Sequence, residues 1–175
     1  MEMAEKLTPS ITTFVREEEL LYRATESSEI WQEEDLVRVG PEAFRDPLNR
    51  PSVDRAEMRG FNPDLTRDYV CQDKSRPDCG IVALYSKQVR QISPLEQLDA
   101  KGQPVSGPQI NVEHVPLPAE DTRPANDSHA EIFGSPHISA KNLFRRLKVR
   151  LAQEAEKNQD QILFPRNAEE RSPKP

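Results

Sequence analysis

The sequence is poor in glycine and lacks the short motifs that mark the common enzyme classes. It has 6 Gly against 16 Pro in 175 residues, and neither a phosphate-binding glycine loop nor a dinucleotide-binding fingerprint is present. An HExxH motif, a nucleophile elbow and the kinase motifs are also missing. No apolar run approaches the roughly 18–20 residues that cross a bilayer, and there is no collagen repeat or sustained heptad. These absences exclude fibrous and membrane-spanning chains and the most easily recognised enzymes.

Cysteine is scarce as well. Cys71 and Cys79 are the only two, and their spacing does not match a zinc-binding pair, nor does a second Cys or His pair complete a site. A disulfide between them would close a small hairpin but would need an oxidising compartment. The first six residues lack the basic and apolar regions of a signal peptide. We therefore expect two reduced thiols, a cytoplasmic protein, no metal and no cofactor.

The composition indicates a small α+β domain. Hydrophobic residues make up 35% of the chain and charged residues 31%, so the apolar content is low but gathered in short, well-formed runs. We expect a polar lead-in over residues 1–10, a single domain over 11–160 and a disordered tail over 161–175. The domain is predicted to hold four to six short strands in a mixed or antiparallel sheet, joined by long proline-rich loops.

Local patterns place the expected elements along the chain. Segments rich in β-branched or alternating apolar residues predict strands at 11–15, 20–25, 80–85, 110–115 and 129–134. A short helix is expected within 27–39, capped by Ser27 or Ser28. Residues 41–65 contain four prolines and read as an ordered loop, and 93–107 as an exposed insertion. The clearest helix spans about 140–159, capped by Ser139, with one apolar stripe.

That last helix also carries a charge anomaly. The net charge is −6, yet residues 139–151 hold five basic residues and no acid. Arg145, Arg146, Lys148 and Arg150 are therefore predicted to bind an acidic protein partner. A simple solvated helix face would show the same pattern. Nucleic acid is a less favoured partner, because the rest of the chain is acidic and phosphate contacts need a broad basic surface.

A second group of residues could carry chemistry. Arg23 ends an early strand and could clamp a phosphate or carboxylate, while Ser52, His129 and Glu131 could orient or protonate a ligand. These four are the candidate catalytic residues. Structural roles also explain the pattern, and more simply: Arg23 could pair with Glu17, Glu18 or Asp54, Ser52 or Asp54 could cap the stretch 55–59, and the histidines could be half-exposed structural residues. His114 and His129 with a carboxylate could in principle hold a metal, but their wide separation is not specific.

Two resemblances rest on short segments in a fixed order. The segments are Leu21-Tyr22-Arg23, Ala43-Phe44-Arg45, Pro51-Ser52-Val53-Asp54-Arg55, Gly80-Ile81-Val82-Ala83-Leu84 and His129-Ala130-Glu131-Ile132. Over about residues 20–155 the chain resembles a family of small, uncharacterised bacterial proteins, which implies a bacterial cytosolic protein. The order Arg23, Ser52, Glu131 is also similar to that of ADP-ribosyltransferase-like toxins, where such residues hold a dinucleotide. Here the serine lies in a proline-rich loop, and no paired glutamate precedes Glu131.

These patterns lead to two hypotheses. The preferred one is a non-enzymatic interaction or accessory module of a bacterial system that binds a protein partner through the basic helix. The alternative is a small nucleotide- or NAD-directed enzyme that uses Arg23 and Ser52 with Glu131 or His129. Convergence of these side chains in one cleft would favour the enzyme.

Overall fold

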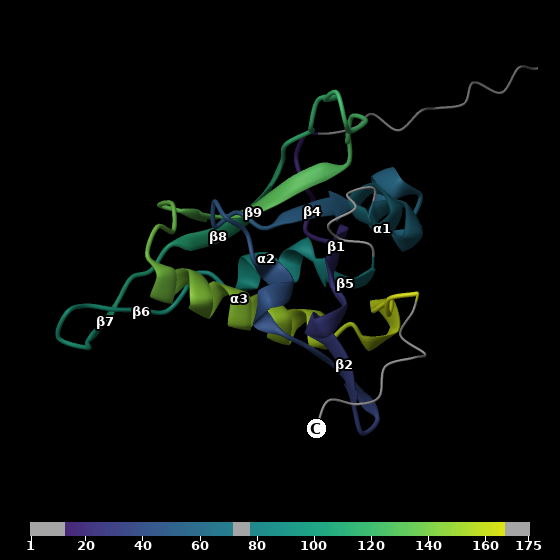
Figure 1. Ribbon diagram of the computed structural model, residues 1–175. Coiled ribbons are helices and arrows are strands. Elements are labelled where there is room, and N and C mark those ends of the chain that lie inside the picture. The colour runs from purple at the N-terminus through teal and green to yellow at the C-terminus, as the bar shows by residue number, and fades with distance from the viewer. Residues whose placement is uncertain (1–12, 72–77, 167–175) are drawn as a thin grey trace, which may run out of the picture.

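The computed structural model describes residues 13–71 and 78–166 (Figure 1). Within these ranges the chain has an α+β fold, as the sequence predicts, with one five-stranded antiparallel sheet, two small hairpins and three α-helices. The strands are β1 (Leu20–Glu26), β2 (Ile30–Glu33), β3 (Leu36–Val39), β4 (Ser52–Arg55), β5 (Cys79–Tyr85), β6 (Gln97–Leu98), β7 (Pro104–Val105), β8 (Gln109–His114) and β9 (His129–Ser135). The α-helices are α1 (Pro63–Cys71), α2 (Ser86–Gln91) and α3 (Lys141–Glu156), and the 3-10 helices are η1 (Ser27–Glu29), η2 (Pro41–Phe44), η3 (Glu57–Arg59) and η4 (Gln159–Gln161).

The main sheet has the order β5-β1-β4-β9-β8. The outer pairs are long: β1 pairs with β5 over the whole length of both strands, and β8 pairs over its whole length with residues 130–135 of β9. Only β4 joins these two pairs. Its Asp54 lies opposite Tyr22 of β1 and opposite His129 of β9. The central strand therefore places Asp54 in the middle of the sheet.

The central strand β4 was not predicted from the sequence. Residues 52–55 were expected within a proline-rich loop, and that expectation is wrong for these four residues. Pro51 has no N–H to donate, but its carbonyl accepts a hydrogen bond from the Ile132 amide at 3.0 Å. Of the four strand residues only Val53 is apolar, whereas Asp54 and Arg55 are buried polar residues. A strand this short and polar carries no period-2 signal.

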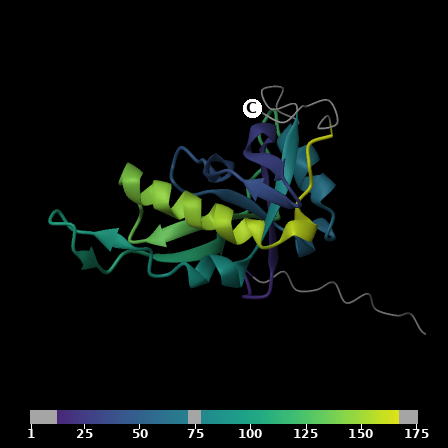
Figure 2. The ribbon, with the colours of Figure 1, turned by 90° about the horizontal axis from the view of Figure 1, so that it is seen from below.

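One face of the sheet is covered by α3, as Figure 2 shows from below. Helix residues Phe144, Leu147, Leu151 and Ala155 form its buried stripe. They belong to one core cluster with strand residues Leu21, Val53, Val82, Leu84, Ala130 and Ile132. The predicted helix is confirmed, though it begins at Lys141 after an N-cap residue, Ala140, that makes no side-chain capping bond. Burial of this stripe, rather than a strong cap, holds the helix in place.

The opposite face is divided into an apolar half and a polar half. On β1 and β5 a second cluster of Leu20, Tyr22, Ala24, Ile81 and Ala83 packs against Val70 and Cys71 of α1. On β4 and β9 the residues of this face are Ser52, Asp54, His129 and Glu131, since paired residues in a register share a face. Because these positions carry polar side chains, this half of the sheet is a candidate location for a functional site.

The segment between β1 and η2 differs from its prediction. The expected helix within 27–39 is wrong, because β2 and β3 form a hairpin from Ile30↔Val39 to Glu33↔Leu36. Only Ser27–Glu29 is helical, as the single turn η1. Ile30 and Val39 are buried in the main core, so tertiary packing of β-branched residues prevails over the local helix signal. Residues 13–15 of the predicted first strand form no strand, and 11–12 lie outside the described residues.

The chain beyond α3 returns to the edge of the sheet. Leu163 exchanges two backbone hydrogen bonds with Ile81 of β5, at 2.8 and 2.9 Å. A Cβ atom on neighbouring Gly80 would lie 2.9 Å from the Leu163 carbonyl oxygen, so glycine is needed for this close approach. Residues 161–166 are thus packed on the domain, although a tail was expected from 161. The rest of that tail and the lead-in 1–10 lie outside the described residues.

Cys71 and Cys79 do not form a disulfide with each other, and Cys79 is buried in the second core cluster. No helix in the described ranges is long and apolar enough to cross a membrane.

Candidate functional site

The outer face of α3 carries the clearest candidate surface. Arg145 and Arg146 are exposed and Arg150 is half-buried, and all three lie away from the apolar stripe of the helix. Arg146 and Arg150 are one helical turn apart on the same side. The segment leading into β6 runs beside them and contributes Leu95 and Glu96.

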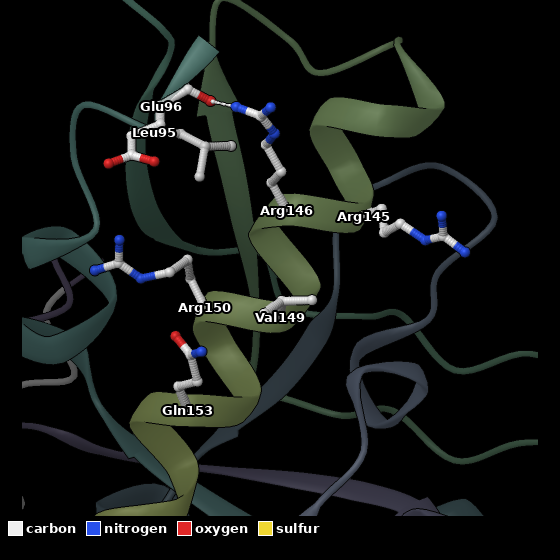
Figure 3. Close-up of a pocket in the computed structure, with 7 residues that line it drawn as sticks. All are labelled: Leu95, Glu96, Arg145, Arg146, Val149, Arg150 and Gln153. Carbon is white, nitrogen blue, oxygen red and sulfur yellow. Dashed lines mark hydrogen bonds between the residues drawn. The ribbon is translucent and has the colours of Figure 1, made fainter.

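Together these residues form a groove of about 250 Å³. We call it the α3 groove; its lining is Leu95, Glu96, Arg145, Arg146, Val149, Arg150 and Gln153. Figure 3 shows Arg146 and Arg150 extending on the side of the Leu95–Glu96 segment, while Arg145 extends from the other flank of the helix. The groove therefore has an apolar floor and a basic rim with one carboxylate, that of Glu96.

The arginines of the α3 groove differ from most others in the molecule. Arg146 donates one hydrogen bond to the Glu96 carbonyl oxygen at 3.2 Å. Among the described residues, neither Arg145 nor Arg150 makes a hydrogen bond or an ion pair, and Arg146 has no acidic partner. Eight other arginines do form ion pairs, namely Arg16, Arg38, Arg45, Arg50, Arg55, Arg59, Arg67 and Arg166. Three uncompensated positive charges are thus gathered around the groove.

Lys148 was predicted to belong to the same binding face, but the structure places it elsewhere. Its side chain is only 11% exposed and pairs with Glu42 of η2. Its ammonium also lies 5.5 Å from the centre of the Phe144 ring. Lys148 therefore fastens α3 to η2, and we do not include it in the candidate surface.

An apolar hairpin continues the α3 groove. Strands β6 and β7 follow directly on Leu95 and Glu96, and Figures 1 and 2 show this hairpin projecting from the body of the domain. Leu98 is 47% exposed and Val105 is 43% exposed. Exposed apolar side chains beside a basic rim are typical of a protein-binding surface.

A second hollow lies on the polar half of the sheet, on the face opposite α3. It has a volume of about 310 Å³, and we call it the β4 pocket. Its lining includes Arg23, Ser52, Asp54, Tyr69, Asn126 and His129. Three of the four predicted catalytic residues, Arg23, Ser52 and His129, therefore line one hollow.

Arg23 lies where the pairing between β1 and β4 ends. The β1–β4 pairing stops after Tyr22↔Asp54, and the Arg23 guanidinium supplies hydrogen bonds beyond that point. It donates to the carbonyl oxygens of Ala43 at 3.0 Å, Ser52 at 2.8 Å and Arg45 at 2.7 Å. Arg23 thus has a structural role in the pocket wall, and its ion pair with Asp54, one of the structural roles considered above, does not form.

Asp54 forms the floor of the β4 pocket and is only 4% exposed. It accepts hydrogen bonds from Arg59 and Thr66 at 2.9 Å and from Asn126 at 2.8 Å. Asn126 in turn accepts from the Ser128 hydroxyl at 2.6 Å. One carboxylate thereby joins β4, η3, α1 and the loop before β9. The sequence analysis missed Arg59, Thr66 and Asn126, whose separation along the chain hides their proximity.

Glu131 is the predicted catalytic residue that stays outside the β4 pocket. It lies opposite Ser52 in the β4–β9 register, but its carboxylate accepts a hydrogen bond from Arg50 at 2.6 Å. Arg50 also reaches Glu113 at 3.5 Å. Glu131 therefore lies on the same face of the sheet as the β4 pocket, but it pairs with Arg50 and does not line the pocket.

The two histidines suggested as metal ligands have different surroundings. His129 Nδ1 lies 2.6 Å from the Val115 carbonyl oxygen. His114 Nδ1 is buried without a hydrogen-bond partner. Burial, followed by the positive charge of Arg55, lowers the pKa of His114 below its ordinary value. Among the described residues, no group of three or more His, Cys, Asp or Glu side chains is arranged to hold a metal ion.

Comparison of this chain with protein-family models, with curated proteins and with solved structures gives no match.

Proposed function

We propose that the chain is an interaction module that docks an acidic segment of a partner protein in the α3 groove. The observation that carries this proposal is the gathering of Arg145, Arg146 and Arg150 without an acidic partner among the described residues. Guanidinium groups bind carboxylates in a planar, two-pronged geometry. An acidic segment would therefore supply the ion pairs that this surface lacks.

The partner is inferred to be a protein because of the apolar parts of the surface. Leu98 and Val105 are exposed on the adjoining hairpin, and the half-buried Val149 lines the groove. These side chains would pack against apolar residues of a peptide, whereas a nucleic acid backbone would gain little from them. The net charge of −6 also weakens attraction to nucleic acid at a distance.

The role as an accessory component of a bacterial, cytoplasmic system remains part of this proposal and is supported by the sequence resemblance alone. The interaction itself is open to a direct test. A displayed library of random 12-residue peptides is selected on the wild-type chain, with counter-selection on the triple variant Arg145→Gln/Arg146→Gln/Arg150→Gln. We expect the selected peptides to be rich in Asp and Glu with one or two apolar residues.

Affinity of a selected peptide is then compared among three proteins. The triple variant is expected to bind at least about tenfold more weakly than wild type, since each charge-assisted pair contributes roughly 0.5–1 kcal/mol at an exposed site. The matched control, Arg16→Gln/Arg45→Gln/Arg166→Gln, removes the same charge at exposed arginines that do not line the groove, and it should bind as wild type does. Equal binding by the triple variant would overturn the proposal. Selection of no peptide, together with tight binding of a duplex DNA, would replace it with a nucleic-acid function.

A further inference from the structure

The α3 groove contains one carboxylate, that of Glu96, on the wall opposite the helix. Glu96 is exposed, and among the described residues its carboxylate makes neither a hydrogen bond nor an ion pair. Its backbone carbonyl oxygen, and not its side chain, accepts the hydrogen bond from Arg146. Figure 3 shows the carboxylate extending away from the Arg146 guanidinium. The groove therefore presents one uncompensated negative charge in addition to its positive charges.

The helix wall of the groove carries charge of the other sign. Arg146 and Arg150 both extend on the side of the Leu95–Glu96 segment (Figure 3), and neither has an acidic partner in the described part of the chain. Because they are four residues apart on a helix, their Cβ atoms are about 5–6 Å apart. A bound segment must therefore bring two carboxylates to one wall and a cation to the other if every charge of the groove is to be paired.

An extended segment has the geometry to do this. Successive side chains of an extended chain point to opposite sides, and residues i and i+2 on one side are about 6.5–7 Å apart. This distance is close to the spacing of Arg146 and Arg150, and residue i+1 then points toward Glu96 on the other wall. A helix presents residues i and i+4 on a single face, so its neighbouring side chains would meet one wall only.

We propose that the partner segment is extended and carries the pattern acid–base–acid, with its carboxylates on Arg146 and Arg150 and its Lys or Arg on Glu96. This inference rests on the docking function proposed above and makes Glu96 a specificity-determining residue. A segment with three consecutive acids would place a carboxylate beside Glu96, and like-charge repulsion would weaken its binding. Glu96 thereby selects among acidic partners.

The test is a double-mutant cycle between Glu96 and the central base of a designed peptide, followed by NMR titration of the full chain. The probe is the blocked peptide Leu-Ser-Glu-Lys-Glu-Ser-Leu, and its counterpart has Gln in place of Lys. Wild type should bind the Lys peptide about 2- to 5-fold more tightly than the Gln peptide, as expected for one exposed ion pair. Glu96→Gln should bind the two peptides with equal affinity. Glu120→Gln, which changes an exposed acid that does not line the groove, should keep the wild-type preference.

A peptide of the same composition, Leu-Ser-Lys-Glu-Glu-Ser-Leu, tests the extended arrangement because its total charge is unchanged while its two acids are adjacent. It should bind wild type at least about 2-fold more weakly than the probe. The inference is overturned if Glu96→Gln keeps the preference for the Lys peptide, if the reordered peptide binds as tightly as the probe, or if none of the peptides binds wild type.

The triple variant Arg145→Gln/Arg146→Gln/Arg150→Gln separates this inference from the docking proposal. If the peptides bind wild type more tightly than the triple variant but without any dependence on Glu96, the docking proposal stands and the acid–base–acid pattern is wrong. If they bind wild type and the triple variant equally, the docking proposal is wrong and this inference is overturned with it.

Discussion

The α3 groove and the β4 pocket differ in whether their charged side chains have partners within the fold. Around Asp54 each buried charge has partners: Arg59 lies 2.8 Å away, and Thr66 and Asn126 occupy the remaining positions. Around α3, the exposed Arg145 and the half-buried Arg150 have no such partners in the described ranges. A buried charge must be compensated within the fold because its desolvation is costly. An exposed charge keeps its hydration, and this makes it available to a second molecule.

The contrast also separates what each surface can do. A saturated network cannot rearrange to meet a large partner, so the β4 pocket keeps a fixed shape. The α3 groove has flexible side chains and a projecting hairpin, which suit a peptide that brings its own carboxylates. The docking proposal is therefore confined to the α3 groove.

The largest expected effect comes from breaking the buried network at its centre. Asp54→Ala would leave the Arg59 guanidinium without its carboxylate and the Asn126 amide without its acceptor. We expect a loss of about 3–5 kcal/mol in the free energy of unfolding, the range for removing one partner of a buried charge pair. Urea denaturation measures it. A loss below about 1 kcal/mol, within the range of an exposed pair, would contradict the distinction between the two regions.

A second buried ion pair, between Glu19 and Arg55, allows the stability of a buried charge to be followed as a function of pH. Glu19 is 5% exposed and accepts two hydrogen bonds from Arg55, each at 2.8 Å. Burial tends to raise the pKa of Glu19, but the hydrogen bonds from Arg55 and Arg16 hold it below its ordinary value of 4.5. A depressed pKa in the folded state contributes stability above pH 4.5, and this contribution is lost as the pH falls through the folded value.

Wild type should therefore lose more unfolding free energy below pH 4.5 than Glu19→Gln, which cannot titrate at this position. Denaturant midpoints measured from pH 7 down to the acid transition provide the comparison. Parallel profiles for the two proteins would show that the Glu19–Arg55 pair does not control acid stability.

The smallest effects are expected on α3 itself. Lys148→Gln removes the pair with Glu42 and the contact with the Phe144 ring, which should cost about 1 kcal/mol of unfolding free energy because Glu42 is largely exposed. The triple variant of Arg145, Arg146 and Arg150 should change it by less than about 0.5 kcal/mol. The effects on peptide binding should follow the opposite order. The triple variant should lose affinity for the peptide, and Lys148→Gln should bind it as wild type does. If Lys148→Gln bound the peptide more weakly than wild type, Lys148 would be part of the docking surface.

Some features could be read from local patterns. The strands over 20–25, 80–85, 110–115 and 129–134 correspond to β1, β5, β8 and β9, because each is a run of apolar or alternating residues long enough to show its period. Helix α3 was equally clear from its apolar stripe. Its run of basic residues was visible as well, since Arg145, Arg146 and Arg150 stand in one acid-free segment.

Other features depended on contacts between distant segments. The hairpin of β2 and β3 replaced an expected helix because Ile30 and Val39 are buried together in the core. Lys148 and Arg150 are two residues apart, yet only the packing of η2 against α3 directs one to Glu42 and the other toward the groove. Helical spacing alone does not say which flank of a helix a neighbouring segment will cover.

The sequence by itself determined the α+β class, the long strands, the amphipathic helix and its excess of positive charge, because these follow from the order of neighbouring residues. Only the tertiary structure decided that residues 52–55 form the central strand, that Asp54 meets Arg59, Thr66 and Asn126, and that Ser52 and His129 line one pocket. These contacts join residues far apart in the chain. They form only when several strands and helices have packed together, and no local pattern records them.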